Sequence, residues 1–151
     1  MKATDLLKKQ HKEVKAFFKK IESTENTRER RRLMSEIVTA LEGHTVIEEE
    51  MFYPAVRGLE TQKAEEMVME AFEEHHVVKL VLAELPQLDP DDERFEAKMT
   101  VLSELVEHHA DEEEKQMFKL ASKLGKEELA ALGEQMQERF EAVRGQRQRA
   151  A

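Results

Sequence analysis

The chain has 151 residues, and 38% of them are charged, giving a formal net charge of -9 at pH 7. This length suits one domain with a single core. Glycine and proline are scarce while Leu, Ala, Glu, Lys, Met and Gln dominate, so the composition predicts long helices and excludes a β-sandwich or β-barrel. The chain has no cysteine. Histidine, aspartate and glutamate are therefore the residue types left as metal ligands.

The charge balance also bears on partners and on location. An acidic protein is a poor general binder of nucleic acid, although Arg144, Arg147 and Arg149 make the last turns locally basic. No apolar stretch approaches the ~20 residues that cross a bilayer, and the first residues lack the apolar core of a secretory signal. We therefore expect a cytoplasmic protein with no nucleic-acid and no membrane partner.

The first two expected helices each carry one apolar stripe with steps of three or four residues. The first begins at Thr4, whose side chain can cap free amides, and its stripe is Leu7, His11, Val14, Phe18 and Ile21. A polar loop at 22–27 follows. The second helix ends where Tyr53 meets Pro54, and its stripe is Leu33, Ile37, Leu41, His44, Glu48 and Phe52.

The third and fourth expected helices follow the break at Gly58. Thr61 caps the third, which ends before Pro86. Its stripe is Met67 or Val68, Ala71, His75, Val78, Leu82 and Leu85. The run at 89–92 predicts the start of the fourth helix, with a cap, a proline at the first helical position and acidic residues against the helix dipole. This helix runs to Gly125, and its stripe is Leu102, Leu105 or Val106, His109, Glu113, Met117, Leu120 and Leu124.

A fifth amphipathic segment covers about 126–144 and needs a partner surface for its apolar face, either on the bundle or in a homodimer. Four long helices with short connections predict an all-α fold, an up-down antiparallel four-helix bundle with an additional C-terminal helix. We expect the bundle domain at 1–125. The C-terminal amphipathic helix and basic tail, 126–151, belong to the same domain.

Metal-ligand side chains interrupt the buried stripe of each of the first four helices. They are His11, His44 with Glu48, His75, and His109 with Glu113. The histidines are 33, 31 and 34 residues apart, as expected if an antiparallel chain crosses one level of the bundle on each pass. In each HxxxE pair the imidazole and the carboxylate lie one turn apart on the same face. Four imidazoles and two carboxylates suit a pair of transition-metal ions bridged by the carboxylates.

Taken singly, each of these residues has an ordinary structural explanation. A lone histidine on an apolar stripe is more often a hydrogen-bonded core residue than a ligand, and glutamate runs usually mark a solvated face. The set favours metal, because two unpaired buried glutamates in one core would cost several kcal/mol each. His76 and His108 are out of phase with the stripes, so we expect them to lie outside the site. The sequence also repeats internally, since HTVIEEEMFY parallels HADEEEKQMF, which predicts a site with approximate twofold symmetry.

These motifs resemble those of the hemerythrin-like HHE cation-binding domains over about Thr4 to Leu124. The resemblance rests on His11, HTVIEEEMFYP from His44, EEHHVVK around His75 and HHADEEEKQMF around His109. It implies a four-helix bundle with two iron ions, bridged by the carboxylates of Glu48 and Glu113 and by an oxo or hydroxo species. The ligand would be dioxygen, peroxide or nitric oxide, and peroxide-decomposing, catalase-like activity would be within reach.

The sequence departs from the oxygen-carrying members in one respect. Those members have five histidines, two of them one turn apart on the third helix, whereas the positions one turn from His75 are Ala71 and Lys79. Glu74 is a candidate to fill this gap, but its phase on the helix is poor. We expect open positions that favour reactivity over oxygen storage. Two alternatives stay open: an iron-handling protein of the iron-sulfur-cluster-repair type, and a helical interaction module stapled by another metal such as zinc.

Overall fold

The computed structural model describes residues 1–150 and contains helices but no strand among them. The first half comprises α1 (Ala3–Ser23), α2 (Thr27–Ile47), the π-helix η1 (Glu48–Phe52) and α3 (Tyr53–Arg57). The second half comprises α4 (Gln62–Glu84), η2 (Leu85–Gln87), α5 (Glu93–Glu112), the π-helix η3 (Glu113–Met117), α6 (Phe118–Ala121) and η4 (Ser122–Leu124). The chain then continues into α7 (Lys126–Ala150). Residue 151, the end of the expected basic tail, lies outside the described residues.

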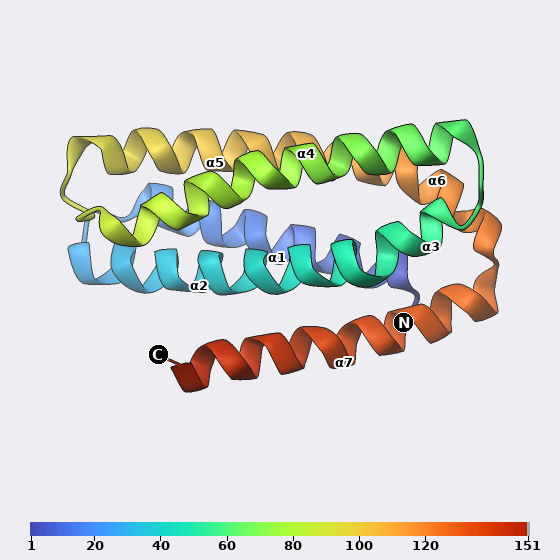
Figure 1. Ribbon diagram of the computed structural model, residues 1–151. Coiled ribbons are helices and arrows are strands. Elements are labelled where there is room, and N and C mark those ends of the chain that lie inside the picture. Colours follow the sequence, from blue (N-terminus) through green and yellow to red (C-terminus); the bar gives the residue numbers. More distant parts are fainter. Residues whose placement is uncertain (151) are drawn as a thin grey trace.

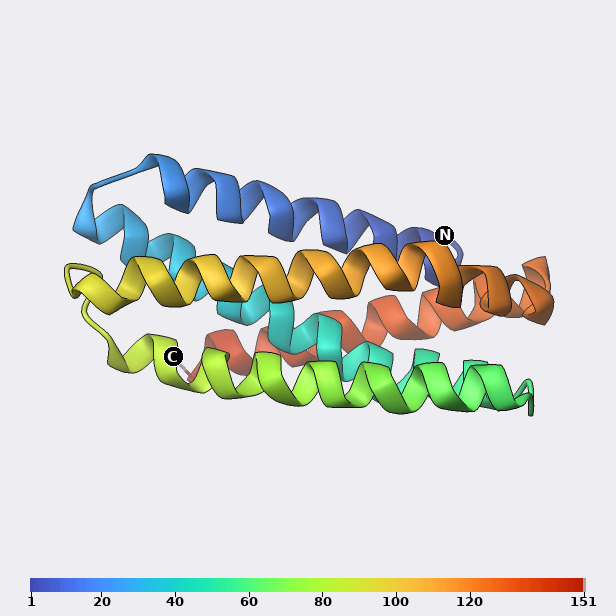
Figure 2. The same ribbon diagram turned by 90° about the horizontal axis from the view of Figure 1, so that it is seen from above.

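Four long helical rods, formed by α1, α2, α4 and α5 with their extensions, run antiparallel to their neighbours in sequence (Figure 1). The α1–α2 and α4–α5 connections lie at one end of the bundle, and the α3–α4 connection lies at the other. Figure 2 shows the same bundle from above, with α7 running behind the other helices. The predicted all-α bundle with an additional C-terminal helix is confirmed.

The helix starts are partly as predicted. The Thr61 side chain accepts a hydrogen bond from the Ala64 amide at 3.1 Å, so the expected cap of α4 is present. Thr4 is not a cap, because α1 already begins at Ala3 and its N-cap residue, Lys2, makes no side-chain cap bond. Asp92 caps α5, whereas Pro90 lies in the preceding turn and not at the first helical position. The turn contains an Asp89 side-chain acceptor for the Asp91 amide, which delays the helix start.

The expected ends of the second and fourth helices also need correction. Pro54 does not stop the chain's helical course, because it lies in the first turn of α3, where its missing N–H and fixed φ are tolerated. A π-helix precedes that turn and shifts the helical register. A second π-helix, η3, interrupts the predicted fourth helix after Glu112 in the same way. That helical course ends at Gly125, as predicted, with a φ of +90° that favours glycine.

Apolar side chains form two buried clusters, one on each side of the polar level of the bundle. One cluster is centred on Phe18, Ile37, Leu102 and Leu85, and the other on Leu7, Ile47, Phe52 and Met136. The predicted stripes therefore face the interior. Among residues 1–150, no helix carries an apolar run suited to crossing a bilayer.

Helix α7 packs on α1 and α2, so its apolar residues Leu129 and Met136 are buried within the chain. It is longer than expected and includes the basic residues, of which Arg147 binds Glu42 at 2.7 Å and Thr39 at 2.9 Å. Gly43 of α2 explains part of this packing, because a Cβ atom there would lie 2.7 Å from the Phe140 ring of α7. The apolar face of the C-terminal helix thus finds its partner surface on the bundle, and a homodimer through this helix stays a prediction.

We expect Gly43→Ala to lower the free energy of unfolding by about 1–3 kcal/mol, because the added methyl group pushes Phe140 away from α2. Gly145→Ala on α7 is the matched control. A Cβ there meets only the end of Arg149 at 3.4 Å, so better helix propensity should raise stability by up to about 1 kcal/mol. Urea denaturation measures both, and equal stabilisation by the two changes would contradict the close contact.

Candidate metal centre

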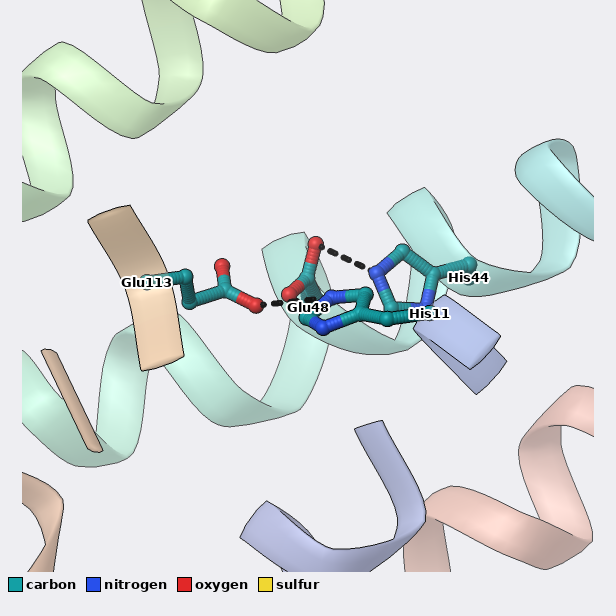
Figure 3. A group of neighbouring side chains, drawn as sticks. All are labelled: His11, His44, Glu48 and Glu113. Carbon is teal, nitrogen blue, oxygen red and sulfur yellow. Dashed lines mark ion pairs between the residues drawn. The ribbon is translucent and has the colours of Figure 1, made fainter. Parts of the chain in front are cut away.

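The structure brings all six predicted residues together in the middle of the bundle. His11, His44, Glu48 and Glu113 form the first donor group, in which one ligand atom from each lies within 4.8 Å of the others (Figure 3). Glu48, His75 and His109 form the second donor group by the same criterion. All six side chains are buried, and Glu48, which belongs to both groups, is fully inaccessible.

Each carboxylate faces one histidine of the pair His11 and His44 and one histidine of the pair His75 and His109. The Oε1 atom of Glu48 lies 3.2 Å from His44 Nε2 and 3.0 Å from His75 Nε2. Glu113 places Oε1 at 3.3 Å from His11 Nε2 and Oε2 at 3.2 Å from His109 Nε2. Two donors that each bind one metal at about 2.1 Å are about 3.0 Å apart when they bind at right angles. The observed separations therefore match donors around shared ions.

The two histidine pairs have nearly the same geometry. The rings of His11 and His44 have centroids 4.9 Å apart and planes at 62°, while those of His75 and His109 are 4.8 Å apart at 61°. The approximate twofold symmetry that the internal sequence repeat predicts is therefore present in the arrangement of the donors.

Three donor atoms in this cluster are buried without a hydrogen-bond partner. They are His11 Nε2, Glu48 Oε2 and Glu113 Oε1. A buried polar atom left unpaired costs about 1–3 kcal/mol, and more when it is charged. All three atoms belong to metal-ligand types and converge on one place. Bound cations would satisfy them, so the residues present fit the metal centre that the sequence predicts.

The Nδ1 atom of each imidazole, which points away from the centre, also has a hydrogen-bond partner. Gln10 Oε1 lies 2.7 Å from His44 Nδ1, and Glu74 Oε1 lies 2.8 Å from His109 Nδ1. Likewise Glu49 Oε2 lies 2.8 Å from His75 Nδ1, and Glu114 Oε2 lies 2.9 Å from His11 Nδ1. A neutral imidazole that donates from Nδ1 has its lone pair on Nε2, so these partners direct all four lone pairs inward.

Tyr53, expected only to end the second helix, belongs to the site. Its hydroxyl lies 2.8 Å from Glu113 Oε2, 3.2 Å from Glu48 Oε1 and 3.1 Å from the Nε2 atoms of both His75 and His109. A phenol has one proton, and the shorter contact indicates that Glu113 accepts it. The interior therefore includes an oxygen group beside the second donor group, where the sequence predicted an open position.

The other missed residues had a signal in the sequence. Gln10 and Glu74 directly precede His11 and His75, while Glu49 and Glu114 directly follow Glu48 and Glu113. Neighbours of ligands that recur in both halves of a repeat are candidates for supporting roles. Glu74, whose poor phase kept it out of the expected ligand set, contacts the outward Nδ1 atom of His109.

Burial and charge act in opposite directions on the pKa values of the centre. Burial lowers the pKa of His109, but the carboxylates of Glu113, Glu48 and Glu74 outweigh it and hold that pKa well above 6.5. The pKa values of His11 and His75 are also raised, because the neighbouring glutamate carboxylates outweigh the effect of burial. Burial tends to raise the pKa of Glu48, yet the surrounding imidazoles hold it well below 4.5. Burial, with Glu113 and Glu48, raises the pKa of Tyr53 well above 10.

Two small cavities adjoin the donors. A void of about 20 Å³ lies beside the four imidazoles, with Val14, Val78, Val106 and Leu41 among its lining residues. A cleft of about 50 Å³ between α4 and the α5–η3 rod reaches His109 and Glu113, and Glu70, Glu74, Glu112 and Met67 also line it. A water molecule needs about 10–15 Å³ on this measure, so both spaces admit only small molecules.

His76 and His108 lie at the surface, outside the six-residue centre. His108 belongs to an outer group with Glu74 and Glu112, in which its Nε2 atom lies 3.9 Å and 3.4 Å from their carboxylates. Its side chain is 67% exposed. Exposed groups of this kind are common without a metal.

Buried imidazoles and carboxylates that converge between antiparallel helices define a metal-binding four-helix bundle. Comparison with known proteins agrees. The hemerythrin HHE cation binding domain family matches residues 2–121. Uncharacterised proteins of Mycobacterium tuberculosis and Mycobacterium bovis are each 32% identical over 151 residues, covering 96% of this chain and 89% of theirs.

A solved structure gives the same result. The crystal structure of a hemerythrin HHE cation binding domain-containing protein from Mycobacterium kansasii is similar with a TM-score of 0.85 and 30% identity. The similarity covers 97% of this chain and 89% of that one. The chain belongs to the hemerythrin HHE cation-binding domain family.

We expect the metal-free protein to lose stability as the pH rises above about 6.5. The raised pKa values of His11, His75 and His109 contribute stability that is fully present below 6.5 and lost as the pH passes through the folded-state values. The lowered pKa of Glu48 contributes stability above 4.5, which is lost as the pH falls. Stability without metal should therefore peak between these limits.

Stabilisation by added metal should have the opposite slope, because ions bind neutral imidazoles. Urea denaturation at about pH 6 and about pH 8.5, with chelator or with excess divalent metal, separates the two effects. A metal-free protein that gains stability between these pH values would contradict the assigned shifts.

We expect Tyr53→Phe to destabilise the metal-free protein by about 1–3 kcal/mol, because the hydroxyl donates to Glu113 Oε2 and the other oxygen already lacks a hydrogen-bond partner. The loss should shrink when metal is bound, since the ions then satisfy the carboxylate. Thermal unfolding with and without chelator measures both values. An equal loss in the two forms would show that the phenol acts only by packing.

Proposed function

We propose that this protein holds two iron ions and that the pair reacts with dioxygen, peroxide or nitric oxide. His11 and His44 would hold one ion and His75 and His109 the other, with Glu48 and Glu113 as carboxylate ligands available to both. The observation that carries this proposal is the set of three buried donor atoms without hydrogen-bond partners at the centre of the two donor groups.

Iron supplies redox chemistry that the side chains lack, because it changes oxidation state and binds small ligands. The chain's own contribution is positioning. The outer partners of the imidazoles fix their orientation, so the donors need little rearrangement to bind cations.

The surroundings favour a small ligand. Apolar clusters on both sides of the centre keep bulk water away, and the cleft at His109 and Glu113 is only about 50 Å³. Diatomic molecules and peroxide fit such a space, whereas larger substrates do not. Without metal, burial and the carboxylates of Glu113 and Glu48 raise the pKa of the Tyr53 phenol, and its hydroxyl donates to Glu113 Oε2 at 2.8 Å.

We expect metal analysis of protein from iron-replete cells to give two iron ions per chain, with near-ultraviolet absorption that a zinc-loaded sample lacks. His44→Ala and His109→Ala should each lose at least one ion. His76→Ala and His108→Ala are surface controls that should retain both. Full retention of iron in both buried variants would exclude the proposed ligands.

Reactivity is tested on the iron-loaded protein by mixing it anaerobically, in reduced form, with dioxygen, peroxide or nitric oxide. We expect a spectral change with at least one of them, and an oxygen electrode measures any peroxide decomposition. An iron pair that stays unchanged with all three would contradict this function. Transfer of that iron to a mild chelator would then support the iron-handling alternative.

A further inference from the structure

The residues behind the four imidazoles follow the internal repeat. Gln10 and Glu74 occupy matching positions, and each holds the histidine of the following long helix, His44 or His109. Glu49 and Glu114 also match, and each holds the first histidine of the other half of the repeat, His75 or His11. The approximate twofold symmetry thus extends to this outer layer.

One of these two matched pairs differs in charge. Glu49 and Glu114 are both carboxylates, whereas Gln10 is a neutral amide opposite the carboxylate of Glu74. Gln10 is only 6% exposed, so water screens the electrostatic difference at this position only weakly. The first histidine pair therefore has one anionic outer partner, and the second pair has two.

The charge difference changes donor strength. A carboxylate that accepts the Nδ1 proton makes the imidazole more basic at Nε2, and its negative charge also attracts a nearby cation. An amide oxygen holds the same proton but adds no charge. Lys79 offsets part of the Glu49 charge at 2.8 Å, yet this lysine is half-exposed and screened by water.

We propose that Gln10 and Glu74 act as positioning residues that make the two metal positions unequal. The position at His75 and His109 binds the first ion more tightly, and the position at His11 and His44 is the weaker, more exchangeable one. This inference rests on the proposed two-metal centre. Tyr53 in one half and Phe118 in the other are a second difference, so the test leaves both unchanged.

The test is a Zn²⁺ titration of the chelator-treated full chain, with affinities measured by calorimetry in competition with a chelator of known strength. We expect two unequal dissociation constants in the unaltered protein. E74Q should weaken the tighter step by about 10–100-fold and bring the two steps together. Q10E should strengthen the weaker step. Glu73→Gln removes the same charge from an exposed neighbour on α4 and should change neither step.

The double variant Q10E/E74Q exchanges the two groups at constant net charge and should reverse the order of filling. Histidine ¹⁵N spectra with one equivalent of Zn²⁺ report that order, since His75 and His109 should shift first in the unaltered protein and His11 and His44 first in the double variant. Glu74 lies partly at the surface, so E74Q alone decides the matter if the buried carboxylate of Q10E prevents folding.

Two equal affinities in the unaltered protein would overturn the inference. So would an unequal pair that E74Q changes no more than Glu73→Gln does. Binding of fewer than two ions to the unaltered protein is a different failure, because it would contradict the proposed two-metal centre itself.

Discussion

The structure depends on burying the Glu48 carboxylate in the middle of a helical bundle. A carboxylate there loses its hydration, a cost of several kcal/mol unless nearby groups compensate. His44 and His75 approach it within 3.2 Å and 3.0 Å, and the Tyr53 hydroxyl lies beside it. His44 and Tyr53 lie on the same rod as Glu48, whereas His75 comes from α4, so these two rods must keep their relative register for the charge to be tolerated. The apolar clusters on each side hold that register.

Helical periodicity was enough to predict the bundle and the convergence of the six donors, because each lies in phase with an apolar stripe. It failed at Tyr53. Five residues along an α-helix turn through about 500°, which places Tyr53 about 140° away from Glu48. In η1 the Tyr53 amide instead bonds the Glu48 carbonyl, five residues back, and both side chains face the centre. Nothing in the stripe pattern signals that change of period.

The two halves share their donors but differ in what covers them. Helix α7 lies along α1 and α2 (Figure 1), and Phe140 packs directly on Gly43, the residue before His44. The matching residue before His109 is the exposed His108, beside the cleft that reaches His109 and Glu113. A glycine that costs about 1 kcal/mol in a helix interior is therefore explained by the closer approach of α7. The repeat supplies an approximately symmetric centre, and of the two helix pairs it is the α1–α2 pair on which the additional helix packs.

The centre has no fifth histidine, but the Tyr53 hydroxyl lies beside the second donor group, where a further ligand was expected to be missing. Ala71 is buried and lines the cleft, while Lys79 turns outward to Glu49, so neither supplies a donor to the interior. In the metal-free centre the phenol beside His75 and His109 differs from an imidazole in holding its proton, because burial and two carboxylates raise its pKa well above its usual value. Six of the central side chains accept protons or offer lone pairs to cations, and this one donates. Without metal, the carboxylates of Glu48 and Glu113 repel each other across the centre, and the Tyr53 hydroxyl, which contacts both, is the neutral group that offsets part of this repulsion.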